Sequence, residues 1–205
     1  MKALSVLLTT SILGLASVTH ADVLIDTFAG ANGGVANIGW TFGVTNTTSY
    51  MGKKFTVGSS YLLDTMTFDM FGTAGLNMNA VIYKDNGGTL GDVVESQTFA
   101  LTGLATHEFV LTSVNHSLLT AGSYYFMVGG AQGNGTSDTW SWNQAADGHL
   151  GDLYFLYAPQ NQFSGPSNIS DVTLRIQGSP VPEPASLGVL GLGVLLLRRR
   201  KTKRA

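Results

Sequence analysis

The sequence predicts an all-β protein, an antiparallel β-sandwich of the jelly-roll type. Apolar and polar side chains alternate over short runs, most clearly at residues 65–70, 107–112 and 171–176. A period of two is typical of strands with one buried face. Clusters of Gly, Asn, Asp and Ser separate these runs, as at residues 85–88 and 164–168, and such clusters favour turns. About ten short strands joined by turns indicate two packed sheets.

The first segment, residues 1–21, has the organisation of a secretory signal peptide. Lys2 supplies a positive start, an apolar stretch follows, and Ala21 provides a small residue at the cleavage position. Asp22 and polar strands come directly afterwards, which argues against a first membrane helix. We therefore expect signal peptidase to remove residues 1–21 during export.

The second segment, residues 22–178, is predicted to be the whole β-sandwich domain. It holds four basic residues against twelve acidic ones, a net charge of −8, whereas the entire chain is at −2. An acidic surface disfavours nucleic acid as a partner. The absence of cysteine excludes thiol catalysis and thiolate metal sites.

Within this domain Trp140 and Trp142 are the best candidates for ligand binding. They are separated by one residue on an expected strand, so their indoles share one face. An exposed pair would stack on sugar rings, whereas a buried pair would fill the core of the sandwich. The sequence leaves both interpretations open.

Asp85 and Asp92 are weak candidates for a metal site. They flank a Gly-rich stretch, and carboxylates on such loops suit calcium. However, Asp-Asn-Gly is also the composition that a tight hairpin requires, and the spacing matches no known calcium loop. We therefore expect a hairpin and no cofactor, with calcium as the alternative.

Residues that could support catalysis are scattered along the chain. His107 and Glu108 are neighbours on an expected strand and should point to opposite faces. His116 and His149 fall in polar loops, and no nucleophile, zinc or phosphate motif occurs. We therefore expect no catalytic residues and no enzyme, with a secreted hydrolase as the least favoured alternative.

The C-terminal tail has three parts. Residues 179–184 form a Pro-rich linker that ends in Val181, Pro182, Glu183 and Pro184, and its prolines favour an extended chain. Residues 185–197 are apolar and uncharged. As a helix they would cover about 20 Å, less than the bilayer core of about 30 Å, so we expect a short transmembrane helix. Residues 198–205 are basic, beginning with Arg198, Arg199, Arg200 and Lys201, which predicts a cytoplasmic end.

In this order and position, the three parts of the tail resemble the PEP-CTERM sorting signal of Gram-negative bacteria. The resemblance implies recognition by exosortase, a membrane protease-transpeptidase, and release or transfer of the protein outside the cell. A weaker resemblance, carried by residues 54–57, 62–68, 81–88 and 119–125, is to the choice-of-anchor sandwich domains. It implies no catalytic residues.

Together these features predict an exported, non-catalytic surface or extracellular-matrix protein that associates with exopolysaccharide or biofilm. The alternative is a lectin-like module that binds extracellular polysaccharide through Trp140 and Trp142. In either case the precursor would be anchored in the membrane only until its tail is processed. The mature chain would then lie at the cell surface or outside the cell.

Overall fold

The structure is a computed structural model that describes residues 20–28, 37–41, 49–130, 139–143, 150–157 and 162–181. The predicted signal peptide up to residue 19, the motif residues 182–184, the apolar segment and the basic tail lie outside these ranges. Within them, no helix has the length and apolar character needed to cross a membrane.

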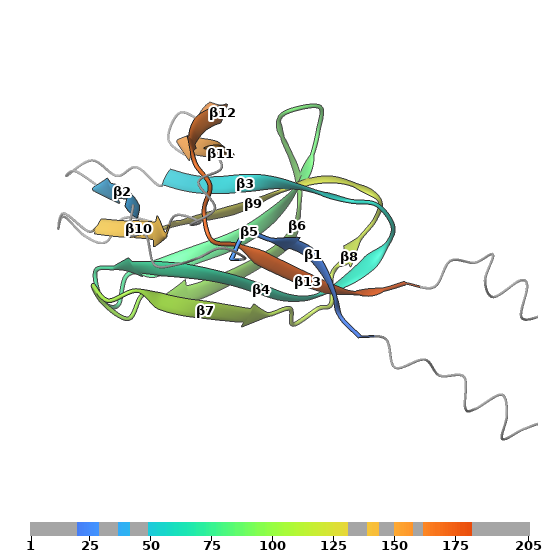
Figure 1. The fold of residues 1–205 in the computed structure, drawn as a ribbon, viewed down its shortest axis with the longest axis horizontal. Helices are drawn as coiled ribbons and strands as arrows, with labels where there is room; N and C mark the ends of the chain where they lie inside the picture. The colour runs from blue at the N-terminus through green and yellow to red at the C-terminus, as the bar shows by residue number, and fades with distance from the viewer. Residues whose placement is uncertain are drawn as a thin grey trace, which may run out of the picture.

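Thirteen strands in the described part form two antiparallel sheets (Figure 1). The first, called sheet A, contains β1 (Asp22–Asp26), β2 (Asn37–Thr41), β4 (Tyr61–Gly72), β7 (His107–Thr112), β8 (Leu118–Leu119), β10 (Thr139–Asn143) and β13 (Arg175–Pro180). The second, sheet B, has the order β12 (Gln162–Ser170), β11 (Leu150–Tyr157), β3 (Ser49–Val57), β9 (Gly122–Gly130), β5 (Asn77–Asp85) and β6 (Leu90–Ala100). The predicted all-β antiparallel sandwich is confirmed.

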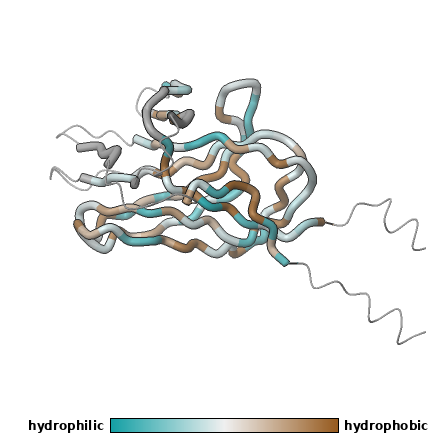
Figure 2. The backbone as a smooth tube through the Cα atoms, viewed as in Figure 1, coloured by the Kyte–Doolittle hydropathy of each residue, from teal (hydrophilic) through white to brown (hydrophobic). Residues whose placement is uncertain are grey.

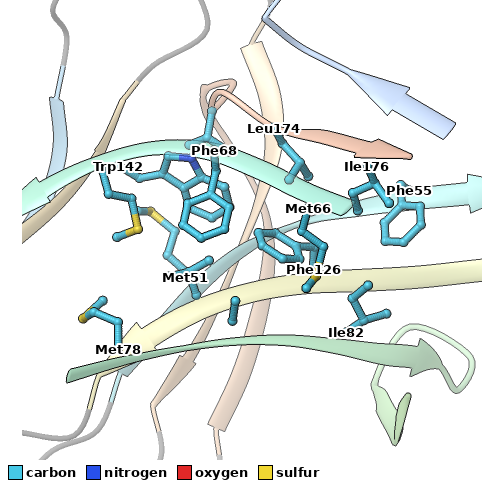
Figure 3. Close-up of a cluster of buried hydrophobic side chains, with 14 of the residues drawn as sticks. Met51, Phe55, Met66, Phe68, Met78, Ile82, Phe126, Trp142, Leu174 and Ile176 are labelled. Carbon is cyan, nitrogen blue, oxygen red and sulfur yellow. The ribbon is translucent and has the colours of Figure 1, made fainter. Parts of the chain in front are cut away.

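The main core lies between the two sheets. Alternation on β4 directs Met66, Phe68 and Met70 inward, where all three are fully buried. Met66 and Phe68 lie beside Phe126 of β9 from sheet B (Figure 3), with the Phe68 and Phe126 ring centroids 5.4 Å apart. Hydrophobic and hydrophilic residues alternate along much of the chain (Figure 2), which is the pattern that a two-layer sandwich requires.

Strand β4 organises sheet A because it pairs with four other strands. Its first half pairs with β13, from Tyr61↔Pro180 to Thr67↔Arg175, and its second half pairs with β10. β7 and β8 also pair with it. The twelve residues of β4 therefore run the length of the sandwich and fix the positions of the elements around it.

Two boundaries differ from those expected. The stretch 164–168, predicted to be a turn, belongs to β12. β12 lies at an edge of sheet B, where Pro166 interrupts no inner ladder. β13 continues to Pro180, so the first two residues of the predicted linker belong to sheet A.

The first and last described strands are neighbours. β1 pairs with β13, with Asp22 opposite Gly178, and the chain leaves both strands at the same end of the molecule (Figure 1). The Val181 N–H donates to the carbonyl of Ser60 at 2.9 Å. The fold thus holds the chain up to the first residue of the predicted sorting motif.

Candidate functional site

Trp140 and Trp142 are fully buried in the main core. The Trp142 indole N–H donates to the Thr173 carbonyl at 2.7 Å, and its ring makes edge contacts with Phe68 and Phe126. The exposed pair on which the sugar-stacking hypothesis depended is therefore absent. Both indoles instead follow the alternative interpretation, as core residues.

The segment that begins at Asp85 forms the hairpin turn between β5 and β6. Gly87 and Gly88 have φ of 64° and 91°, a backbone conformation that glycine adopts without strain. The Asp85 carboxylate accepts the Gly88 N–H at 2.7 Å and pairs with Lys54 at 2.6 Å. Asp92 is exposed on β6. Among the described residues, no three His, Asp or Glu side chains are placed to hold a metal ion.

The histidines do not converge on a described carboxylate cluster. His107 and Glu108 lie on β7 opposite Met70 and Asp69, respectively. His116 is mostly exposed, with Nδ1 at 3.6 Å from an Asp64 oxygen, while the other Asp64 oxygen accepts the Ser179 hydroxyl at 2.7 Å. His149 lies outside the described residues.

A second apolar cluster lies on the outer face of sheet B. The sequence pattern did not predict it. On β9, Tyr124 and Phe126 point into the main core, so Tyr125 and Met127 point the opposite way. We call this cluster the aromatic face. It consists of Tyr50, Tyr83, Leu90, Tyr125, Met127, Tyr154, Leu156 and Phe163.

The rings of the aromatic face are in direct contact. Tyr154 and Phe163 are stacked, with centroids 5.6 Å apart and planes at 7°. Tyr125 packs its edge against both, at 4.9 Å and 5.1 Å. Tyr125 and Tyr154 are buried, whereas Tyr50, Tyr83 and Phe163 are partly exposed. The cluster therefore has a buried floor and three rings that reach solvent.

Glycines make room for these rings. A Cβ atom on Gly129 would lie 2.6 Å from the Tyr50 ring, and one on Gly165 would lie 2.7 Å from the Tyr154 ring. Real side chains do not tolerate such distances. Both tyrosine rings therefore pack directly against the backbone of a neighbouring strand.

An ion pair borders the aromatic face. The Lys54 ammonium lies 5.4 Å from the Tyr125 ring centroid while it pairs with Asp85. The hydrogen bond between the two raises the pKa of Lys54 and lowers the pKa of Asp85. Burial raises the pKa of Tyr125, and the nearby Asp85 charge adds to the effect. The site thus combines ring faces with a charged donor and a charged acceptor.

A buried carboxylate, Glu95 of β6, links sheet B to the turn between β7 and β8. It is 4% exposed and accepts hydrogen bonds from the side chains of Gln97, Ser113 and Ser117. Ser113 and Ser117 belong to the turn between β7 and β8. This network joins sheet B to sheet A. Glu95 lies 18 and 22 residues from the two serines in the sequence, so no local motif could have indicated the network.

Of the predicted sorting residues, only Val181 is among the described ones. Pro182, Glu183, Pro184 and the basic residues 198–201 lie outside them. Residues 180–201 match the family model of the PEP-CTERM protein-sorting motif. The chain is therefore a β-sandwich protein that carries this motif. The motif marks an exported protein that is sorted by exosortase and anchored transiently in the membrane before processing.

A comparison with curated proteins found no match. Among solved structures, the chain is similar to TmCBM61, determined in complex with beta-1,4-galactotriose. The identity is 14% and the TM-score 0.34, over 59% of this chain and 70% of that one. It is also similar to the cysteine protease and lectin-like domains of Cwp84, a surface layer associated protein of Clostridium difficile. There the identity is 13% and the TM-score 0.47, over 70% of this chain and 36% of that one. At these TM-scores, neither likeness carries an argument about ligand or activity.

Proposed function

We propose that this protein is a non-catalytic component of the cell surface or extracellular matrix that associates with exopolysaccharide. The observation that carries the proposal is the sorting motif at residues 180–201, because it directs the folded domain out of the cell. An acidic domain with a net charge of −8 suits a hydrated polymer matrix better than an anionic membrane or a nucleic acid.

The test is to fractionate cells that produce the protein. Isolated exopolysaccharide should contain the processed protein, and enzymatic depolymerisation of that polysaccharide should release it. A protein that stays in the culture medium, independent of the polysaccharide, would contradict the proposal. Cells that lack exosortase provide the control, since their precursor should remain in the membrane fraction.

We propose as a second candidate function that the sandwich is a carbohydrate-binding module and that the aromatic face is its binding site. Sugar rings pack their C–H faces on aromatic side chains, and tyrosine adds a polar tip. Tyr50, Tyr83 and Phe163 reach solvent on this face, and Lys54 and Asp85 beside it supply a donor and an acceptor for sugar hydroxyls.

The second candidate is tested by Tyr83→Ala and Phe163→Ala in a polysaccharide pull-down. Each should weaken binding about tenfold, equivalent to about 1.4 kcal/mol. Val110→Ala is the matched control, since Val110 is an exposed apolar residue on β7 of sheet A. Unchanged binding by folded Tyr83→Ala and Phe163→Ala variants would contradict this use of the aromatic face.

A further inference from the structure

Exposed apolar side chains gather at the end of the sandwich where the chain leaves the fold. Leu62 of β4 and Leu118 of β8 are partners on adjacent strands, and they are 39% and 52% exposed. Val114 in the next turn is 80% exposed, and Val23 near the start of β1 is 52% exposed. Four of the seven large exposed hydrophobic residues in the described part thus lie here.

The turn that carries Val114 is fixed to the same end of β4. The Ser113 N–H donates to the Asp64 carbonyl at 2.7 Å, and the Leu63 N–H donates to the Ser117 carbonyl at 2.9 Å. We call the surface of Leu62, Val114 and Leu118 the exit patch. It is held by backbone hydrogen bonds on both sides of the turn, so its position relative to β4 is defined.

The C-terminal tail leaves the fold at this end. β4 begins at Tyr61, which pairs with Pro180, and the Val181 N–H donates a hydrogen bond to the Ser60 carbonyl. Four peptide units separate Val181 from Ala185, where the apolar segment begins. They span at most about 14 Å. A tail inserted in a bilayer at Ala185 therefore keeps this end of the domain close to the lipid headgroups.

We propose that in the membrane-anchored precursor the exit patch rests on the bilayer surface, with Leu62, Val114 and Leu118 against the lipid. This inference rests on the proposed export route, in which the tail anchors the precursor. Because the exported domain carries a net charge of −8, anionic headgroups would repel it, so the contact is apolar. The tether makes the contact intramolecular, and a weak apolar affinity then suffices.

The chain has no cysteine, so a single introduced cysteine gives an unambiguous probe. Full-length precursor carrying a fluorophore at Leu118→Cys is reconstituted in phosphatidylethanolamine/phosphatidylglycerol vesicles. Leu104→Cys is the control, because Leu104 is 76% exposed and lies at the opposite end of β4. Its neighbour Gly103 accepts a hydrogen bond from the N–H of Gly72, the last residue of β4. The β4 partners of the two sites, Leu62 and Gly72, are ten residues apart, which corresponds to about 34 Å along the strand.

Spin-labelled lipid should quench the fluorophore at position 118 at least threefold more strongly than at position 104. Leu62→Asp combined with Val114→Asp should lower quenching at position 118, and unchanged quenching in this variant would overturn the inference, because the tether alone would then account for the signal. Val114→Cys repeats the measurement should Leu118→Cys fail to fold. Equal quenching at both ends of a vesicle-bound precursor would overturn this inference alone. Failure of the unlabelled precursor to float with the vesicles would overturn both this inference and the proposed anchoring step.

Discussion

At the scale of single residues, Trp142 shows what decides between a binding residue and a core residue. Its indole needs a partner for one N–H, and β10 places that N–H against the Thr173 carbonyl in the core. The indole nitrogen, which would otherwise favour an exposed position, therefore has its hydrogen-bond partner inside the core. Alternation in the sequence places Trp140 and Trp142 on one face but does not say which face is covered.

Replacement of Trp142 by alanine should therefore act on stability. The fully buried ring contacts Phe68 and Phe126, so Trp142→Ala should lower the free energy of unfolding by about 3–5 kcal/mol. Urea denaturation followed by circular dichroism measures this change. Trp142→Phe, which keeps most of the apolar volume, should cost less. A stable Trp142→Ala variant would show that the indole does not support the core.

Asp69 is a second residue whose environment has a measurable consequence. Burial raises its pKa, and the Glu108 charge on the paired strand raises it further. The folded state therefore binds the proton more tightly than the unfolded state, and the ionised form is the less stable one. At a pH above the pKa of Asp69 in the folded state, its ionised carboxylate makes the protein less stable than a neutral side chain would. This loss of stability shrinks as the pH falls and is gone below the pKa of Asp69 in the unfolded state.

Asp69→Asn should accordingly stabilise the domain at pH 7 by about 0.5 kcal/mol, a small gain because the side chain is only partly buried and solvent screens its charge. The gain should vanish near pH 3, where Asp69 itself is neutral. Melting temperatures at both pH values test the sign. Glu108→Gln, which removes only the repulsion, should give a smaller gain. A variant less stable than the parent at pH 7 would contradict this account.

At the scale of elements, local pattern predicted well where one face of a strand is polar. β4 and β7 follow simple alternation, and the turn at residues 85–88 has the residues that its backbone requires. β9 is apolar on both faces, so its sequence does not reveal the aromatic face, which depends on which strands lie beside it. β12 contains Gly165 and Pro166, which favour a turn, and only its place at a sheet edge makes it a strand.

Gly129 tests whether close strand packing supports the aromatic face. A Cβ atom there would lie 2.3 Å from the Ser49 backbone oxygen and 2.6 Å from the Tyr50 ring. Because the backbone of β3 would have to move, Gly129→Ala should cost roughly 2–3 kcal/mol. Gly58→Ala is the control, since nothing lies within 4 Å of its Cβ position. It should leave the free energy of unfolding within about 0.5 kcal/mol of the parent value. Equal stability of the two variants would contradict the packing described for β3 and β9.

At the scale of the whole molecule, the two sheets present different outer faces. Sheet A carries polar and charged residues such as Asp69, Glu108 and Arg175, while sheet B carries the aromatic face with its bordering ion pair. The tail leaves from the end of β13 in sheet A. The exit patch and the start of the tail lie at one end of sheet A, whereas the aromatic face lies on the outer face of sheet B, so anchoring and ligand binding are tested by different variants.

Processing of the precursor should remove its C-terminal tail. The last described residue, Val181, is hydrogen-bonded to Ser60, and Pro182, Glu183 and Pro184 follow it in the sequence. Proline favours an extended chain, which is the conformation that a protease requires. Mass spectrometry of the exported protein should therefore find a chain that begins at Asp22 and ends near Pro184.

Glu183→Ala should leave the precursor in the membrane fraction, because it alters the sorting motif. Glu108→Ala is the matched control, since it removes an exposed carboxylate on β7 and should be processed like the parent. An exported protein that still carries residues 198–204 would contradict tail removal. Normal processing of Glu183→Ala would show that the carboxylate between the two prolines is not read.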